Sequence, residues 1–314
     1  MITPTRCRFR LLIPAAGLSL LPLLASPVRA QTTYYYKADN TSSGNWSNAN
    51  VWNTNVEGTG TNHTLNASNS NIYNSNAKAV RSTGTAFLGG SLILSGHSTD
   101  VGGANYSLML TSASMTIANL STQAFSGENN FVLIRSTINS ATALTTTNLV
   151  VGTETRFHFQ SSITRSLNLT TTNLSGSGDM LVGINGPGAD SPSTVALSAS
   201  NASAYTGDIV VYSGSSMDFN GTFTSGGGLS LLSGAVLTLD QSLTFTSLSI
   251  GGSLLSAGTY SFATLNSAYD AYFANGGSGS ITVAAVPEPS AFASVLGAAS
   301  LLALTLRRRL VARA

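Results

Sequence analysis

A repeated hexapeptide constrains the fold of this chain more than any other feature of its sequence. Leu-Thr-Thr-Thr-Asn-Leu occupies positions 144–149 and returns at positions 169–174, while a weaker copy, Thr-Ile-Ala-Asn-Leu, occupies positions 116–120. Periods in the twenties are typical of chains whose successive turns stack on one another. Each turn would bury a narrow apolar line and place Asn, Ser and Thr against equivalent residues of the next turn, about 4.8 Å away.

Short runs of alternating apolar and polar residues indicate β-strands along most of the chain. Ser, Thr, Asn and Gly separate these runs, and no long stretch has helical periodicity. The clearest runs are residues 91–94, 107–110, 114–117, 131–134, 156–159, 166–169, 208–212, 230–232, 235–239 and 242–246.

Charged residues make up only 8% of the chain. A stack of strands explains this scarcity, because identical charges would face each other at the spacing between strands. We therefore predict an all-β chain whose body, residues 31–285, is a right-handed parallel β-helix, a solenoid with three short strands per turn. A sandwich of antiparallel strands with the same turn spacing is the alternative.

The C-terminal segment at 286–314 has three parts in a fixed order. An extended segment comes first, because each proline fixes its own φ and moves the preceding residue out of the helical region. An uncharged run at 290–306 follows, and it is just long enough to cross a bilayer as a single C-terminal transmembrane helix. The basic tail at 307–314 would stop transfer and keep the end cytoplasmic. The motif consists of Val286, Pro287, Glu288, Pro289 and Ser290, and the stop-transfer residues are Arg307, Arg308 and Arg309.

This arrangement at 286–314 resembles the PEP-CTERM sorting signal of Gram-negative bacteria. The resemblance implies that exosortase, a membrane-embedded cysteine protease-transpeptidase, recognises Pro287, Glu288 and Pro289 and processes the chain as its substrate. The Leu-Pro-x-Thr-Gly motif of Gram-positive sortase substrates is missing. An ordinary C-terminal membrane anchor after a proline-containing linker is the alternative.

Residues 1–30 have the order of parts of a secretory signal peptide. Arg6, Arg8 and Arg10 form a basic region, and an apolar stretch follows. Small residues lead up to Ala30, so signal peptidase would cleave between Ala30 and Gln31. The only cysteine of the chain lies within this segment. The mature chain would therefore contain no disulfide, zinc–thiolate site or thiol nucleophile.

The formal net charge of +2 arises from the two ends of the chain. Residues 1–30 carry four arginines and no acid, and residues 287–314 carry four arginines and one acid. The body at 31–286 has six basic residues against eleven acids, a net charge of −5. Nucleic-acid binding is excluded for such a body, because it needs clustered Lys and Arg.

Two stretches of the body resemble secreted bacterial repeat proteins. Residues 197–215 resemble the autotransporter-associated β-strand repeat, which has an Asn-x-Tyr-Thr-Gly turn between strands; here extra residues separate Asn201 from Tyr205. Residues 45–53 resemble the tryptophan-containing opening of such proteins. Trp46 and Trp52 would cap the open end of the stack, or alternatively form a platform on which sugars stack.

Catalysis on a β-helix would need carboxylates that converge on one face. The candidates are Asp179, Asp190, Asp208, Asp218 and Asp240. No separation between consecutive candidates matches the period of the hexapeptide, so we do not expect neighbouring candidates to stack. His63, His97 and His158 lack metal-ligand spacing. We predict no catalytic residue, metal or cofactor.

The sequence thus predicts an exported structural or adhesive protein and not an enzyme. It would be anchored transiently in the inner membrane and then passed to the cell surface or the extracellular biofilm matrix. Its expected partners are signal peptidase, an exosortase-type enzyme, the membrane and an extracellular polysaccharide. A carbohydrate-binding or carbohydrate-active β-helix protein delivered by the same route is the alternative.

Overall fold

The computed structural model describes residues 31–37, 45–48, 50–66, 70–96, 106–125, 131–136, 141–159, 166–186, 189–190 and 192–285. The chain divides into two units, residues 1–30 and 31–314, and every described residue belongs to the second. The predicted signal peptide and sorting tail therefore lie outside the described residues. In the described part, no helix is long and apolar enough to cross a membrane; the predicted span at 290–306 is not included in it.

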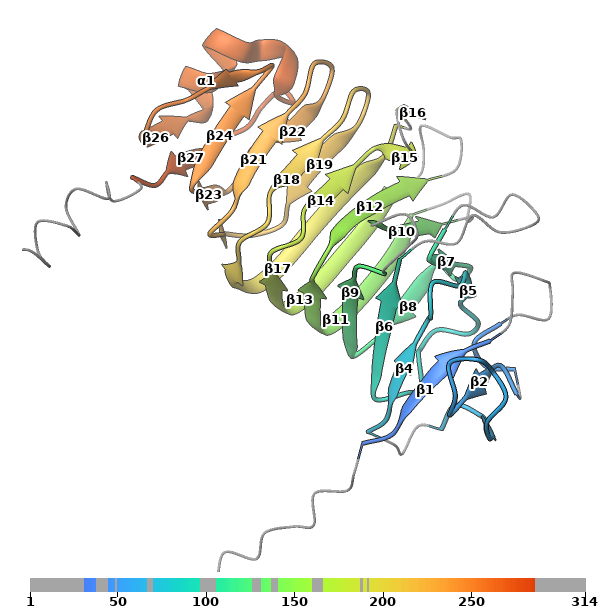
Figure 1. Cartoon of the computed structure of the whole chain (residues 1–314). Helices are drawn as coiled ribbons and strands as arrows, with labels where there is room; N and C mark the ends of the chain where they lie inside the picture. Colours follow the sequence, from blue (N-terminus) through green and yellow to red (C-terminus); the bar gives the residue numbers. More distant parts are fainter. Residues whose placement is uncertain are drawn as a thin grey trace, which may run out of the picture. The chain divides into compact units, whose positions relative to one another are not determined.

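The described chain is mostly β-structure, with parallel strands arranged in sheets (Figure 1). Over these residues the largest sheet has 12 strands, in the order β22 (Val236–Thr238), β19 (Ser216–Phe219), β17 (Thr194–Tyr205), β13 (Ser166–Gly176), β11 (Thr142–Val151), β9 (Asn119–Gln123), β6 (Ser91–Ser95), β4 (Ile72–Asn74), β1 (Thr33–Tyr36), β2 (Trp52–Asn53) and β3 (Asn62–His63), with β8 (Ser114–Thr116) also paired to β11.

The second sheet has nine described strands: β25 (Ser253–Leu254), β24 (Ser247–Ile250), β21 (Gly228–Leu231), β18 (Ile209–Val211), β14 (Met180–Val182), β12 (Glu154–Phe159), β10 (Phe131–Ser136), β7 (Leu108–Leu110) and β5 (Val80–Arg81). A four-stranded sheet contains β20 (Phe223–Thr224), β23 (Ser242–Phe245), β27 (Ser280–Val283) and β26 (Gly258–Ser261). A hairpin joins β15 (Ile184–Gly186) and β16 (Ala189–Asp190), and the helices described are α1 (Phe262–Tyr269) and the 3₁₀ helix η1 (Asp270–Tyr272).

The chain passes back and forth between the two large sheets. Strands β11, β13 and β17 belong to the first sheet, and β12, β14 and β18, which follow each of them in turn, belong to the second. Neighbouring strands within the first sheet pair in parallel: Leu144 of β11 lies opposite Leu169 of β13, and Leu169 lies opposite Leu197 of β17. The parallel pairing excludes the antiparallel sandwich that the turn spacing had left open.

The long strand β11 pairs with two different strands along its length. Its first part pairs with β8 and its second part with β9, and the carbonyl oxygen of Ala118 accepts the N–H groups of both Thr147 and Asn148 at 2.9 Å. Strand β13 continues both parts of β11 in one register, and β17 continues them with a one-residue shift between Asn173 and Ser175. The two parts of β11 therefore pair with different strands that precede it in the chain.

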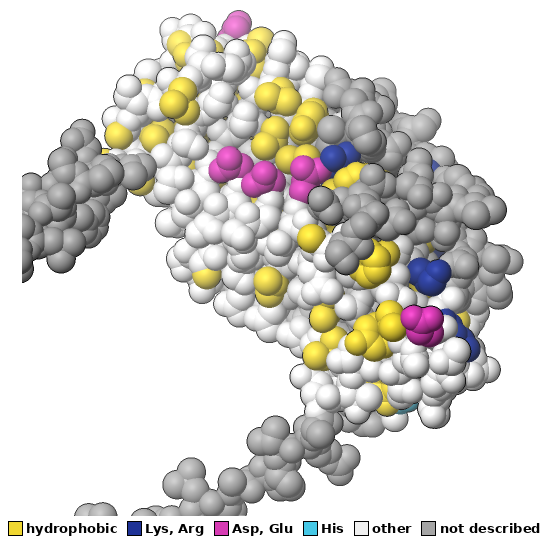
Figure 2. Space-filling view, viewed as in Figure 1, with side chains coloured by type: hydrophobic (Ala, Val, Ile, Leu, Met, Phe, Trp, Pro, Cys, Tyr) yellow, Lys and Arg dark blue, Asp and Glu magenta, His cyan; other side chains and the backbone are white. Residues whose placement is uncertain are grey.

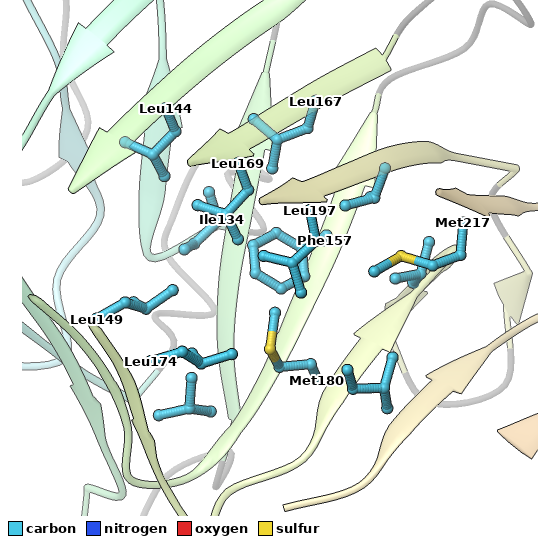
Figure 3. Packing of buried hydrophobic residues seen from close by; sticks show 14 of the residues in the cluster. Ile134, Leu144, Leu149, Phe157, Leu167, Leu169, Leu174, Met180, Leu197 and Met217 are labelled. Carbon is cyan, nitrogen blue, oxygen red and sulfur yellow. The ribbon is translucent and has the colours of Figure 1, made fainter. Parts of the chain in front are cut away.

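Alternate side chains of these strands fill one continuous interior. In β13, Leu167, Leu169 and Thr171 are buried, whereas the residues between them are exposed. Figure 3 shows buried side chains from both large sheets packed together. Burying a leucine in this way stabilises the fold by about 1.5–3 kcal/mol. The hydrophobic alternation noted in the sequence is thus the alternation between interior and surface.

Glycine is required where successive passes approach most closely. A Cβ atom on Gly207 would lie 2.1 Å from the carbonyl oxygen of Gly178, and one on Gly227 would lie 1.8 Å from that of Gly207. Contacts this short are excluded for real side chains. These three glycines therefore form a column in which each backbone packs directly on the one before.

Antiparallel pairing closes both ends of the described stack. At the N-terminal end, β1 pairs with β2 and β2 with β3, all antiparallel. At the C-terminal end, β24–β25 and β26–β27 are antiparallel. The short helix α1 follows β26; the Ser261 hydroxyl caps its N-terminus by accepting the Thr264 N–H at 3.2 Å, and Leu265 is buried. The sequence pattern does not predict this helix, because its eight residues are too few to show a helical period.

Candidate functional site

The predicted sorting and stop-transfer residues lie outside the described part of the chain, and so does Ala30. Gln31, the residue predicted to follow the signal cleavage, is the first described residue. Its side-chain amide donates a hydrogen bond to the backbone oxygen of Ser70. This contact places Gln31 against the segment that leads into β4.

The two tryptophans are interior residues. Trp46 and Trp52 are 1% and 0% exposed. The Trp52 indole N–H donates to the Trp46 carbonyl at 2.8 Å, and the Trp46 indole N–H donates to the Thr83 carbonyl at 3.1 Å. A sugar platform needs an exposed ring face, so the predicted sugar-stacking role does not fit these two residues. Their rings instead pack near the closed N-terminal end, where Phe87 and Tyr73 join them.

A smaller aromatic stack involves His63. The ring of Tyr34 lies parallel to the His63 ring, with centroids 4.0 Å apart. The Tyr73 hydroxyl lies 3.0 Å from His63 Nε2. Burial lowers the pKa of His63, since a charged imidazolium loses solvation there. Tyr36, two residues after Tyr34, is fully buried.

A column of asparagines lies part-way along the long strands. Asn148 donates its side-chain N–H to Asn119 Oδ1 at 2.7 Å, and Asn173 donates to Asn148 Oδ1 at 2.9 Å. Asn119 in turn donates to the Gly90 carbonyl at 2.8 Å. Asn201 continues the column in register with Asn173. The repeat in the sequence predicted this stacking of identical residues, and the strand registers confirm it.

Acidic residues stack in a second column. The registers align Thr155 of β12 with Met180 of β14, and Met180 with Ile209 of β18. The residues that immediately precede these three are Glu154, Asp179 and Asp208, which therefore lie at consecutive positions in the stack. The Asp208 N–H donates to Asp179 Oδ1 at 2.9 Å, across a separation of 29 residues in the chain. Figure 2 shows a short row of acidic side chains on the visible face. Spacing between neighbouring aspartates could not reveal this pair, because Asp190 lies between its two members in the sequence.

Arg156 neutralises one end of this acidic row. Its guanidinium lies 2.5 Å from Glu154 Oε1 and sits 3.7 Å from the centroid of the Phe131 ring. Asp208 Oδ1 accepts the Gly228 N–H at 2.7 Å. Each acid of the row thus bonds either the arginine or the backbone of the next pass.

Asp218 and Asp240 form the other carboxylate pair. Partial burial raises the pKa of Asp218, and the negative charge of Asp240 raises it further. Such a shift is typical of two acids that share one environment. Asp190 is in β16, which pairs with β15.

His63 is in β3 and His158 in β12, while His97 lies outside the described ranges. Within those ranges no group of three or more His, Cys, Asp or Glu residues could hold a metal ion.

Two cavities open on the surface of the described residues. The first has a volume of about 270 Å³ and lies over β4, β6, β9 and β11. The second, of about 360 Å³, lies beside Trp46 and is lined by Leu65, Leu88 and the segment from Thr83 to Ala86. Neither cavity has a charged residue in its lining.

Comparison with protein-family models, with curated proteins and with solved structures found no match to this chain.

Proposed function

We propose that this chain is a structural or adhesive protein of a bacterial cell surface or its polysaccharide matrix. In this proposal the body at 31–285 is a right-handed parallel β-helix with three strands per turn. The parallel stacks, and the pairing of β11 with β8 and then with β9, support this description. The protein performs no catalysis, and its function is to present a rigid, sparsely charged surface.

The observation that carries the proposal is the use of polar side chains within the stack. The amides of Asn119, Asn148 and Asn173 bond to one another, and the carboxylates of Asp179 and Asp208 accept backbone N–H groups. Catalytic sites commonly use asparagine and aspartate. In this chain, these side chains hold successive passes together. Hydrogen bonds between repeated side chains stabilise a stack at each level.

Delivery follows from the two ends of the sequence. Signal peptidase removes residues 1–30, the uncharged run at 290–306 holds the chain in the inner membrane, and an exosortase-type enzyme cuts near Pro287–Pro289. The last described strand, β27, ends at Val283. Only two further described residues separate it from the motif at Val286, so the cleavage site directly follows the folded body.

Intact-mass measurement of the protein from its native host tests this delivery. The wild-type chain should lack Arg307–Arg309 when the processing enzyme is active and retain them when its gene is deleted. A Pro287→Ala/Pro289→Ala variant should retain them in both strains. Pro192→Ala is the matched control and should be processed normally. A wild-type chain that keeps its arginines in both strains refutes the sorting proposal and leaves an ordinary anchor.

A carbohydrate-active protein is the second candidate, and the Asp218–Asp240 pair is the observation that favours it. A raised pKa in one of two neighbouring acids is the pattern of a general acid beside a second carboxylate. Release of new reducing ends or unsaturated products from the host polysaccharide would support it. That activity should vanish in Asp218→Asn and persist in Asp190→Asn.

A further inference from the structure

The cavity over β4, β6, β9 and β11 has a lining of distinctive chemistry. Its volume of about 270 Å³ is close to the lower end of the range for ligand pockets, about 300–1,000 Å³. It lies on the regular strands of the largest sheet, so its walls are set by backbone hydrogen bonds. Its lining consists of amides, hydroxyls and aliphatic side chains: Gln31, Ile72, Ser91, Ile93, Asn119, Leu120, Ser121, Asn148 and Val150.

Strand register explains why polar and apolar groups alternate there. Ser91, Asn119 and Asn148 follow one another along one column, because Leu92 pairs with Leu120 and Leu120 with Leu149. Ile93, Ser121 and Val150 form the adjacent column. Val150 is 40% exposed although it is a large aliphatic residue on a regular strand. A strip with two aliphatic side chains and one hydroxyl therefore lies beside a fully polar strip, and Val150 is in contact with solvent.

The amides of this lining have fixed orientations and spare hydrogen-bonding capacity. Asn148 uses one N–H on Asn119 and receives one bond from Asn173; Asn119 uses one N–H on Gly90. A primary amide has two N–H groups and two acceptor lone pairs. Each amide thus keeps a second N–H and a second lone pair available. The column holds both amides in place before any ligand arrives, which lowers the entropic cost of binding.

We propose that this cavity binds a segment of an uncharged polysaccharide. A sugar ring offers hydroxyls that both donate and accept, as an amide and a serine require, and C–H faces that fit an aliphatic strip. The lining contains neither a cation for a uronate or phosphate nor an acid for a cationic sugar. The inference deepens the proposed function, because it names the polymer class to which the surface protein adheres and the site of contact.

The test uses the full-length protein in mild detergent and the extracellular polysaccharide of the native host, separated into neutral and acidic fractions. Val150→Trp fills the cavity from an exposed position and should weaken binding to the neutral fraction at least about tenfold. Val56→Trp is the matched control: Val56 is 47% exposed and is absent from the cavity lining. It should bind as the wild type does.

A second variant, Ser121→Trp, enters the cavity from β9 and should have the same effect. Thermal unfolding checks that each variant is folded, and either cavity variant alone is sufficient for the test. Binding only to the acidic fraction, binding to neither fraction, or equal binding by the cavity variants and the control each overturns the proposal. Such a failure leaves the processing of the tail unaffected, so it is distinguishable from a failure of the proposed function.

Discussion

The backbone N–H of Asp208 donates a 2.9 Å hydrogen bond to the carboxylate of Asp179, 29 residues earlier in the chain. Asp208 then accepts the N–H of Gly228 in the same way, at 2.7 Å. The carboxylates thus link three passes of the chain through bonds that run along the stack. Hydrogen bonds from neutral N–H groups to a charged acceptor are stronger than those between neutral groups, and they compensate for the repulsion between stacked acids.

Replacing Asp179 should separate the stabilising hydrogen bond from the repulsion between the two carboxylates. Asp179→Ala removes the acceptor and should lower the free energy of unfolding by about 1–2 kcal/mol. Asp179→Asn keeps an acceptor oxygen and removes the repulsion with Asp208, so it should cost clearly less. Urea unfolding of both variants measures the difference. Equal losses would show that the hydrogen bond is not the relevant contact.

Asn148 should be more important for stability than Asn201, although both belong to the same column. Asn148 both donates to and accepts from its stacked neighbours, so Asn148→Ala should cost about 2 kcal/mol. Asn201 is exposed, and its side-chain oxygen accepts hydrogen bonds from Ser203, a near neighbour in the chain. Asn201→Ala should cost less than about 0.5 kcal/mol. Chemical denaturation gives both values, and similar losses would contradict a stabilising ladder.

Gly207 should tolerate no side chain. Its Cβ would meet the Gly178 carbonyl oxygen at 2.1 Å, so Gly207→Ala must push two passes apart and should cost about 2–3 kcal/mol. The matched control is Gly226→Ala, where the nearest atom is a methyl group of Thr206 at 3.2 Å. That change should cost less than about 1 kcal/mol. Thermal unfolding of both proteins compares them, and equal midpoints would refute the close approach.

Stability should fall as the pH drops through the titration of His63. Burial lowers the pKa of His63 in the folded state below its ordinary value of 6.5. The unfolded chain therefore takes up a proton first, and stability present above pH 6.5 is lost as the pH falls through the folded-state pKa. His63→Gln should reduce this dependence. Thermal midpoints of both proteins, measured in steps from about pH 8 to about pH 5, provide the check; parallel curves would contradict it.

Stacking could be predicted from the sequence wherever identical residues recur. The Asn148–Asn173 contact followed directly from the repeated hexapeptide, and the β-strands followed from alternation. Asp179 and Asp208 carried no such signal because the length of a pass varies. Leu144 pairs with Leu169 and Leu169 with Leu197, so the second of these passes is longer than the first. Loops between strands absorb the difference, and sequence spacing alone does not reveal which loop is longer.

The role of the two tryptophans could not be predicted from the local sequence, for a different reason. Two tryptophans in an asparagine-rich segment fit an exposed platform as well as a buried cap, because the local pattern is the same in both cases. What decides is the pairing of Tyr36 with Trp52 and of Trp52 with His63, which folds the tryptophan segment over the open end of the stack. Antiparallel closure of this kind depends on contacts between distant residues, and no short motif encodes it.

The closed ends have a consequence for assembly. The outermost strands of the two large sheets among the described residues have two or three residues each: β3 and β22 in one, β5 and β25 in the other. Short edge strands are poor templates for further strands. A copy of this protein therefore cannot readily extend another by adding strands to its sheets, as amyloid does. The number of strands in each sheet is therefore set by the length of the chain and not by the concentration of the protein.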